Sequence, residues 1–178
     1  MKDLGRAFIG GGTPTTSNEL FWNGDLPWFQ SSDLDGEENF HLLPNKRIST
    51  YAVKNSSAKE IPGGSIAIVT RVGVGKVAYI PFTYATSQDF LSLTGLDVDP
   101  IFGVFMITKA IRDNVAQQGS AIKGVSGKEL KELSVEIPSK LEQKKIGMVL
   151  INTENLITLH QRNATLDNQF IIIFNTLF

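Results

Sequence analysis

The sequence predicts an α+β fold (mixed α/β) followed by one long helix, and three features of the chain support this. Residues 66–70 and 76–80 are apolar, β-branched runs joined by a glycine-containing segment, a pattern typical of a β-hairpin. Residues 99–118 begin with Asp and Pro and carry apolar side chains at helical spacing. The C-terminal residues keep such spacing as far as the sequence runs. We therefore expect a mixed α/β domain at residues 1–138 and a helical arm at residues 139–178.

The N-terminal third is expected to contain short elements separated by turns. In order, these are a strand at 5–9, a Gly- and Thr-rich loop at 10–18, a helical turn from Asn18 to Trp22, a turn at 23–25 and a capped segment at 31–34. An acidic loop at 35–39 follows, and residues 48–53 alternate weakly, as a strand would.

The middle helix should begin at Asp99, because Asp is a good N-cap and Pro100 suits the first helical position. It should end near residues 118–119. Its predicted apolar face consists of Ile101, Val104, Phe105, Thr108 and Ile111. A short turn capped by Ser126, a last strand at 133–137 and the closing Pro138 complete the domain.

The arm has a strong start signal, because Ser139 can cap a helix and Glu142 can bond back to it as a capping box. At about 1.5 Å per residue it would be about 50 Å long, which exceeds the width expected of a domain of this size. Part of it should therefore project and pair with another helix, although packing on its own domain is the alternative. The predicted seam consists of Ile146, Val149, Leu150, Leu156, Ile157, His160, Ala164 and Phe170.

Composition limits the function classes. The 178 residues include no Cys and two His, which excludes a disulfide framework and a thiolate or recognisable zinc site. The apolar run at 170–174 is too short to span a bilayer, and we expect another chain to bury it. No signal pattern is present, so a cytoplasmic location is the default expectation. The net charge of −1 is not typical of a protein that binds nucleic acid without a partner, because such proteins usually carry a basic surface.

Catalytic motifs are weak. Residues 73–76 resemble a phosphate loop, but Thr70 stands where a Walker A motif has Gly, and Val77 where it has Ser or Thr. The acidic residues within 33–38 are more simply a solvated loop than a carboxylate cluster, and His41 is more simply structural than a general base. We therefore predict no catalytic residues, no metal site and no cofactor.

Recognition of nucleic acid is the better-supported interpretation. Cations suited to phosphates are interspersed with amides and hydroxyls suited to base edges. The candidate DNA-binding residues are Lys46, Arg47, Lys54, Asn55, Arg71, Lys76 and Tyr84. The alternative is an ordinary solvated surface, which the near-neutral net charge favours.

Several motifs resemble the specificity subunits of type I restriction–modification systems, in particular one target recognition domain with its following conserved helix. The opening signature is Gly11-Gly12-Thr13-Pro14, Thr16-Ser17-Asn18, Phe21-Trp22, Asn23-Gly24-Asp25 and Pro27-Trp28. Further matches are residues 54–59, 71–76, 85–90, 137–138 and 142–146.

This resemblance implies a target recognition domain with a mixed sheet and a coiled-coil-forming helix. It implies a noncatalytic DNA reader in which each recognition domain reads one half of a split double-stranded target, while antiparallel helices set the distance between the halves. Methylation subunits, which use S-adenosylmethionine on adenine, dock around such a reader, and a restriction subunit cuts. These partner subunits would supply many of the contacts to DNA.

The chain departs from the usual subunit, because it has one recognition domain and one helix where the family has two of each. It is either a fragment or a half-subunit that forms a homodimer through residues 139–178. A homodimer would read an inverted repeat with a fixed interruption. A protein-interaction subunit that joins or inhibits a larger assembly without reading DNA is the alternative function, and an unrecognised small enzyme is a third.

Overall fold

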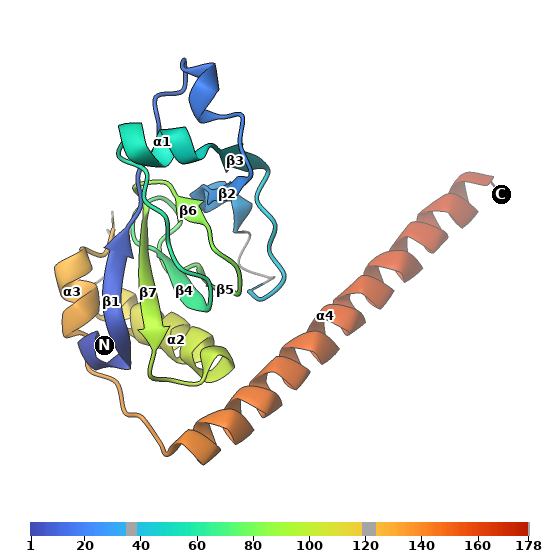
Figure 1. Cartoon of the computed structure of the whole chain (residues 1–178). Coiled ribbons are helices and arrows are strands. Elements are labelled where there is room, and N and C mark those ends of the chain that lie inside the picture. Colours follow the sequence, from blue (N-terminus) through green and yellow to red (C-terminus); the bar gives the residue numbers. More distant parts are fainter. Residues whose placement is uncertain (35–38, 119–123, 178) are drawn as a thin grey trace.

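The computed structural model describes residues 1–34, 39–118 and 124–177, with side chains described through residue 116 and from 124 to 161. The predicted acidic loop falls largely at 35–38, outside the described residues. The side chains of two predicted seam residues, Ala164 and Phe170, also lie outside them. The described elements form an α+β body and a projecting helix, as predicted (Figure 1).

The main sheet has four antiparallel strands in the order β1-β7-β4-β5. Its strands are β1 (Gly5–Gly10), β4 (Ser65–Val69), β5 (Val77–Ile80) and β7 (Phe90–Leu96). The predicted β4–β5 hairpin is confirmed, with Ser65 opposite Ile80. Gly73 and Gly75 in its connection have φ values of 83° and 92°, which residues with a Cβ rarely adopt.

A smaller sheet has the order β3-β2-β6. It consists of β2 (Leu26–Phe29), β3 (Lys46–Ile48) and β6 (Ala85–Thr86). Strand β2 pairs antiparallel with β3 and parallel with β6, which confirms a mixed sheet.

Strand β4 lies at the centre of the body, and all five of its residues are buried. Ile66 and Ile68 face the core under α2 (Pro100–Gln118), whereas Ala67 and Val69 face a second core around Phe29. This burial on both faces explains why the strand reads as a continuous apolar run.

Helix α2 begins and ends where predicted, but its buried face differs from the predicted one. Val104 and Ile111 are buried as expected, together with Phe102 and Ile107, which the prediction omitted. Ile101, Phe105 and Thr108 are only half-buried. The helix is therefore rotated toward Ile107 relative to the predicted apolar face.

Short helices complete the body. The 3-10 helices are η1 (Lys2–Leu4), η2 (Glu19–Phe21) and η3 (Ser31–Asp33), and the α-helices are α1 (Thr50–Asn55) and α3 (Gly127–Glu132). Asn18 and Ser126 cap η2 and α3 as predicted, each accepting a backbone N–H with its side-chain oxygen.

Two predicted strands are wrong. Residues 50–55 form α1, because the Ser49 hydroxyl accepts the Ala52 N–H and starts a helix. Residues 133–137 form no strand: Leu133 and Val135 pack against the core without a pairing strand in the described part of the chain. The alternation of apolar and polar residues at 133–137 therefore reflects the packing of one side of this segment on the core, and not pairing in a sheet.

Helix α4 (Lys140–Leu177) contains 38 residues and extends away from the body (Figure 1). Its rise of about 1.5 Å per residue makes it about 57 Å long. Its base packs on α2, and the Asn39 amide donates to Glu154 Oε1 at 3.0 Å, which joins the middle of the helix to the body. No helix in the described ranges is both long and apolar enough to cross a bilayer.

Candidate nucleic-acid interface

The loop at residues 11–18, which we call the signature loop, is held against the body by close backbone contacts. A Cβ at Gly11 would lie 2.1 Å from the Ser87 carbonyl oxygen, and one at Gly12 would lie 2.2 Å from the Ser57 carbonyl oxygen. The Gly12 N–H also donates to the Thr86 carbonyl at 2.8 Å. Glycine is required at both positions because any side chain would push the loop off its support.

Two tryptophans fix the signature loop from one side. Trp28 Nε1 donates to the Gly12 carbonyl and Trp22 Nε1 donates to the Thr15 carbonyl, each at 3.1 Å. Their rings meet edge to face with centroids 5.0 Å apart. The Lys46 ammonium lies 5.6 Å from the Trp22 ring and 5.8 Å from the Trp28 ring, within the range of a cation–π contact. The loop therefore has a cation placed at its flank.

Polar side chains border the other side of the loop. Thr13 Oγ1 donates to Gln88 Oε1 at 2.5 Å, and Ser57 Oγ donates to the Thr13 carbonyl at 3.3 Å. Gln88 lines a shallow groove together with Arg71 and Thr70. The signature loop thus contacts Trp22 and Trp28, whose rings lie near Lys46, and Gln88, which shares a groove with Arg71.

The structure places five of the seven candidate DNA-binding residues at the surface: Lys46, Arg47, Lys54, Asn55 and Arg71. Arg47 also donates to the Asp25 carbonyl at 2.8 Å, and the Asn55 amide donates to the Tyr51 carbonyl at 2.9 Å. These bonds orient both side chains while leaving them exposed.

The other two candidates have structural roles, and we correct their assignment. Tyr84 is 0% exposed, its hydroxyl is bonded to Ser65 Oγ at 2.9 Å and Ser92 Oγ at 3.0 Å, and burial raises its pKa. The half-buried Lys76 directs its ammonium to the carbonyls of Leu34 and Ser31. The Tyr84 hydroxyl and the Lys76 ammonium thus bond to groups within the body.

Sequence reasoning did not include Thr13 and Gln88 among the candidate contacts. Both belong to motifs of the family signature, but their contact joins residues 75 positions apart. Only the folded chain brings these residues together with Arg71. Within the described ranges, no three His, Asp or Glu side chains come together as a metal site.

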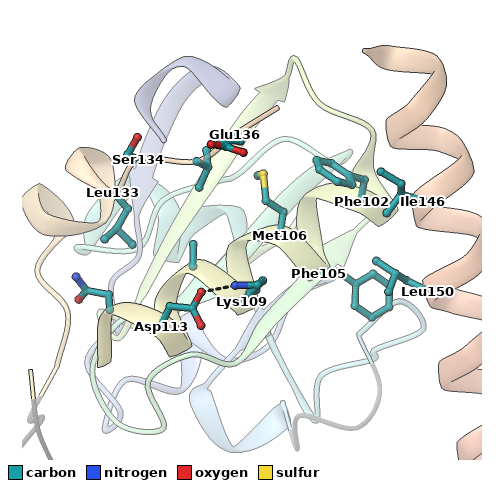
Figure 2. A pocket seen from close by; sticks show the side chains of 13 residues that line it. Phe102, Phe105, Met106, Lys109, Asp113, Leu133, Ser134, Glu136, Ile146 and Leu150 are labelled. Carbon is teal, nitrogen blue, oxygen red and sulfur yellow. Dashed lines mark hydrogen bonds and ion pairs between the residues drawn. The ribbon is translucent and has the colours of Figure 1, made fainter. Parts of the chain in front are cut away.

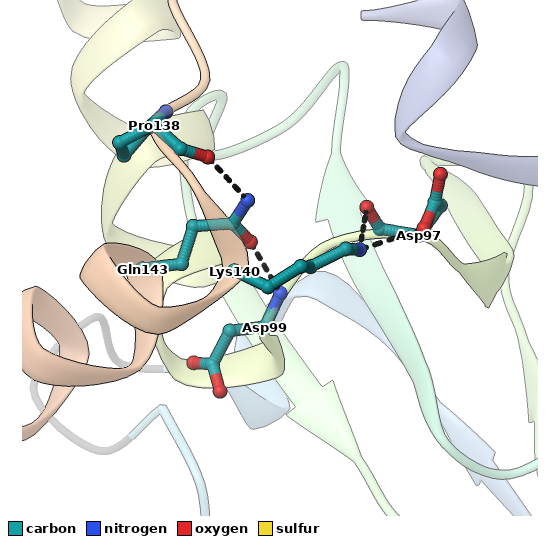
Figure 3. Close-up of polar contacts among 5 residues, drawn as sticks. All are labelled: Asp97, Asp99, Pro138, Lys140 and Gln143. Atoms are coloured by element: carbon teal, nitrogen blue, oxygen red, sulfur yellow. Dashed lines mark hydrogen bonds and ion pairs between the residues drawn. The ribbon is translucent and has the colours of Figure 1, made fainter.

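The base of α4 is fixed to the body by polar contacts (Figure 3). Gln143 is 2% exposed; its Oε1 accepts from the Asp99 N–H and its Nε2 donates to the Pro138 carbonyl, both at 2.9 Å. Lys140 Nζ lies 2.6 Å from Asp97 Oδ1, and this hydrogen bond holds the pKa of Asp97 below its usual range. A Cβ on Gly147 would come within 3.1 Å of the Phe102 backbone nitrogen, so the helices approach closely there.

Beyond this base, the predicted seam is uncovered. Val149, Leu156 and Ile157 are 65%, 67% and 53% exposed, and Ile146 is 39% exposed. His160 is also exposed and Leu150 half-buried. Thr153, Leu156, Ile157, His160 and Gln161 line a shallow groove along the helix. Large apolar side chains left in water in this way indicate a missing partner surface.

The sequence and fold match known proteins. The model of the type I restriction modification DNA specificity domain matches residues 1–167. The type I restriction enzyme MjaIX specificity subunit of Methanocaldococcus jannaschii is 30% identical over 184 residues, covering 100% of this chain and 42% of that protein. The EcoR124I/EcoR124II specificity subunit of Escherichia coli is 27% identical over 170 residues, covering 88% of this chain and 40% of that protein.

Solved structures show the same fold. The HsdS subunit from Thermoanaerobacter tengcongensis aligns with a TM-score of 0.63 at 21% identity, over 88% of this chain and 37% of that chain. A chain from a structure of type I R-M complex assembly and conformational transition aligns with a TM-score of 0.65 at 20% identity, over 87% of this chain and 37% of that one. The chain thus spans less than half the length of these relatives. Because the family model covers most of its residues, the chain belongs to the type I restriction modification DNA specificity domain family.

Proposed function

We propose that this chain is a noncatalytic DNA reader of a type I restriction–modification complex and that it recognises one half of a bipartite target. The observation that carries the proposal is the signature loop, which the body holds rigidly and which has exposed cations and amides around it. Lys46 lies beside the tryptophans that contact the loop, Gln88 contacts the loop directly, and Arg71 shares a groove with Gln88.

The chemistry of this surface suits a DNA duplex. Lys46, Lys54 and Arg71 can neutralise phosphates, whereas the Asn55 and Gln88 amides can bond base edges. The loop needs little ordering on binding, since its backbone is already bonded to the body. Few cations are available, so we propose that methylation subunits dock around the chain and supply further contacts to the duplex. A restriction subunit could then join that assembly.

We further propose that two copies pair through α4 and form a homodimer with two recognition domains. The uncovered seam supports this, because a second copy offers the same apolar stripe. A twofold dimer would present two identical signature loops, so the target would be an inverted repeat with an interruption set by the helices. Two unrelated half-sites in a sequencing readout of methylated sites, with this chain as the only specificity component, would contradict the homodimer.

Arg71→Ala tests the DNA-reading part of this proposal. In complex with a methylation subunit, the variant should bind target DNA more weakly, and the slope of log affinity against log salt should decrease by about 1, because one phosphate contact is lost. Binding is measured by fluorescence anisotropy at several salt concentrations. Arg112→Ala, which removes an equal charge from an exposed position on α2, is the matched control and should change neither quantity.

Two outcomes would contradict parts of this proposal. Unchanged affinity and slope in Arg71→Ala would remove Arg71 from the interface. A complex that protects no defined sequence from nuclease would instead favour an interaction subunit that joins or inhibits a larger assembly. The uncovered stripe on α4 is compatible with that second function.

The solution mass tests the homodimer. Light scattering of the purified chain at several concentrations should give twice the mass of one chain, and Leu156→Asp should give the mass of one chain. The carboxylate would have to be buried without a partner in the paired helices, which is strongly unfavourable. Lys144→Asp, at an exposed position outside the predicted seam, is the control and should remain dimeric. A single-chain mass for the unaltered protein at every concentration would contradict pairing.

A further inference from the structure

Two grooves on the body differ in the chemistry of their linings. The groove between α2, residues 133–136 and the base of α4 is mainly apolar, and the Lys109 and Asp113 side chains at its edge bond to each other (Figure 2). The groove beside the signature loop is lined in part by the exposed polar side chains of Arg71 and Gln88. Because base edges are read by hydrogen bonds, the second groove is the one that suits DNA.

Gln88 lies in a tight turn that the body holds in place. The turn, residues 87–90, is closed by a backbone hydrogen bond of 3.3 Å between its first and last residues. The Thr70 N–H donates to the Asp89 carbonyl at 2.7 Å, which joins the residue before Arg71 to the residue after Gln88. The Arg71 and Gln88 side chains are therefore anchored at the same end of the main sheet.

The Thr13 hydroxyl sets which end of the Gln88 amide faces outward. Its Oγ1 lies 2.5 Å from Gln88 Oε1. Donor–acceptor distances are about 2.5–3.0 Å for O–H···O bonds and about 2.7–3.2 Å for N–H···O bonds, so this contact matches the first kind. The hydroxyl donates, because an amide oxygen only accepts. With Oε1 turned toward the signature loop, the exposed end of the amide is Nε2, which only donates.

The charged groups around this amide favour an acceptor as its ligand. The Arg71 guanidinium, which lines the same groove, carries donors only. The Asp89 carboxylate accepts from Ser87 Oγ at 3.2 Å. The Glu129 carboxylate accepts from the Ser126 N–H at 2.7 Å. Both carboxylates thus bond within the body, and a ligand that enters the groove meets the donors of the amide and the guanidinium.

We propose that Gln88 reads a guanine in the major groove of the target and that Thr13 is its positioning residue. This inference rests on the proposed DNA-reading function and adds the base that is read. Guanine presents two acceptors, O6 and N7, in the major groove, whereas cytosine presents an amino donor. Thymine presents one acceptor beside a methyl group and should rank second.

The bond to Thr13 is what separates guanine from adenine. A glutamine commonly reads adenine with both ends of its amide, since adenine presents the N7 acceptor beside the N6 amino donor. In this chain Gln88 Oε1 faces Thr13, so the adenine amino group would meet no acceptor on the amide. Guanine needs donors alone, and Nε2 supplies them.

Selection of bound sequences tests the assignment. The chain, in complex with a methylation subunit, is mixed with DNA duplexes of random sequence, and the bound duplexes are sequenced. Gln88→Glu should change one position of the half-site, which the unaltered chain reads as guanine. The new carboxylate can still accept from Thr13 but presents an acceptor in place of Nε2, so the preference should shift from guanine to cytosine by about fivefold or more. The other positions should not change.

Variants at Thr13 test its positioning role. Thr13→Val removes the hydroxyl at nearly constant shape and lets the Gln88 amide turn, so adenine should gain about fivefold or more relative to guanine at the same position. Thr13→Ser keeps the hydroxyl and should keep the unaltered selection. Asn152→Asp makes the same change of charge as Gln88→Glu at an exposed position of α4, and should leave the selected sequence unchanged.

The possible results separate this inference from the proposed function. If the unaltered complex selects no defined sequence, DNA reading fails and the guanine assignment fails with it. If it selects a defined sequence but Gln88→Glu leaves the selection unchanged, or weakens all sequences equally as loss of a phosphate contact would, DNA reading stands and the guanine assignment is overturned. A change at a position that the unaltered chain reads as another base would also overturn it. Unchanged selection in Thr13→Val would overturn the positioning role.

Discussion

Apolar side chains are buried in the body but exposed along much of the arm. In the body, Ile66, Ile68 and Leu93 are all 0% exposed, because helix α2 or the second sheet covers each face of the main sheet. In the arm, Val149 and Leu156 are 65% and 67% exposed. The body therefore completes its core within one chain, whereas the arm beyond its packed base leaves large apolar side chains exposed in the part of the chain that the structure describes.

This difference indicates where each part obtains its stability. The body's core should make it stable as a single chain, independent of protein concentration. An exposed helix gains little from its intrinsic propensity, so the outer part of α4 depends on packing against a partner. Its stability should therefore increase with protein concentration, by mass action.

The largest expected effect separates these two sources of stability. Leu93→Ala removes a fully buried side chain from β7 and should lower the free energy of unfolding by about 2–5 kcal/mol. Leu156→Ala removes the same atoms from an exposed position and should leave the unfolding of the body nearly unchanged. Urea unfolding followed by tryptophan fluorescence measures this, since Trp22 and Trp28 both lie in the body.

The same pair of variants should show the reverse order in association. Leu156→Ala should weaken the dimer, whereas Leu93→Ala, studied at urea-free conditions where it is folded, should not. Equal losses of body stability in the two variants would show that Leu156 belongs to the core of the body, and would contradict the distinction between a buried body and an exposed arm.

The sequence predicted those elements that are set by local chemistry. Each of the helices η2, α3 and α4 is preceded by Asn18, Ser126 or Ser139, whose side-chain oxygen accepts an N–H of the first helical turn. Such a cap can be recognised in the sequence because the residues involved lie within about four positions of one another. Strand β7 was missed because it contains Ser92 and Gly95, and its pairing with β1 is formed by residues far apart in the chain. Its position in the sheet depends on tertiary packing.

The candidate site follows the same rule. Exposed cations such as Lys46 and Arg71 were predictable from composition, because charged side chains usually remain in water. Lys76 could not be separated from them, since the Leu34 and Ser31 carbonyls that receive its ammonium lie more than forty residues earlier in the chain. Burial of Tyr84 likewise depends on two sheets meeting around it.

A smaller effect should follow from changing the contact between the two regions. Gln143→Ala leaves the Asp99 N–H without its acceptor at a buried site, which should cost about 1–3 kcal/mol. Hydrogen exchange should show faster exchange in the first turns of α4 and at the start of α2. Lys144→Ala changes an exposed neighbour and should leave both segments protected. If Gln143→Ala left exchange unchanged, the packing around Gly147 alone would hold the arm.

Tyr84→Phe tests the corrected role of this residue within the body. It should lower the free energy of unfolding by about 1–2 kcal/mol, because the buried Ser65 and Ser92 hydroxyls lose their shared partner. DNA affinity of the folded complex should not change. Tyr51→Phe, at a residue 50% exposed, is the control for stability. Weaker DNA binding at unchanged stability would restore Tyr84 to the interface.

The smallest expected effect is a pH dependence at the starts of α3 and α4, because each start has a Ser cap bonded to a Glu three residues later. Hydrogen bonds from the Ser126 and Ser139 hydroxyls and N–H groups hold the pKa values of Glu129 and Glu142 below the usual range. A lowered pKa in the folded state means that each carboxylate stabilises its helix start above the ordinary carboxyl pKa of about 4. That stabilisation is lost as the pH falls through the lowered value.

The two starts should respond differently to this loss. Helix α3 keeps Leu130 in the core at 0% exposure, so packing should hold it after Glu129 is protonated. The start of α4 relies more on polar contacts, and protonation of Asp97 also weakens its bond to Lys140. Amide exchange between pH 6 and pH 3, compared at each pH with an Asp97→Asn/Glu142→Gln variant, should show the unaltered chain approaching the variant at the start of α4 as the pH falls. A constant difference between the two proteins would mean that these carboxylates do not hold the arm, and that Gln143 and the contact at Gly147 provide its attachment.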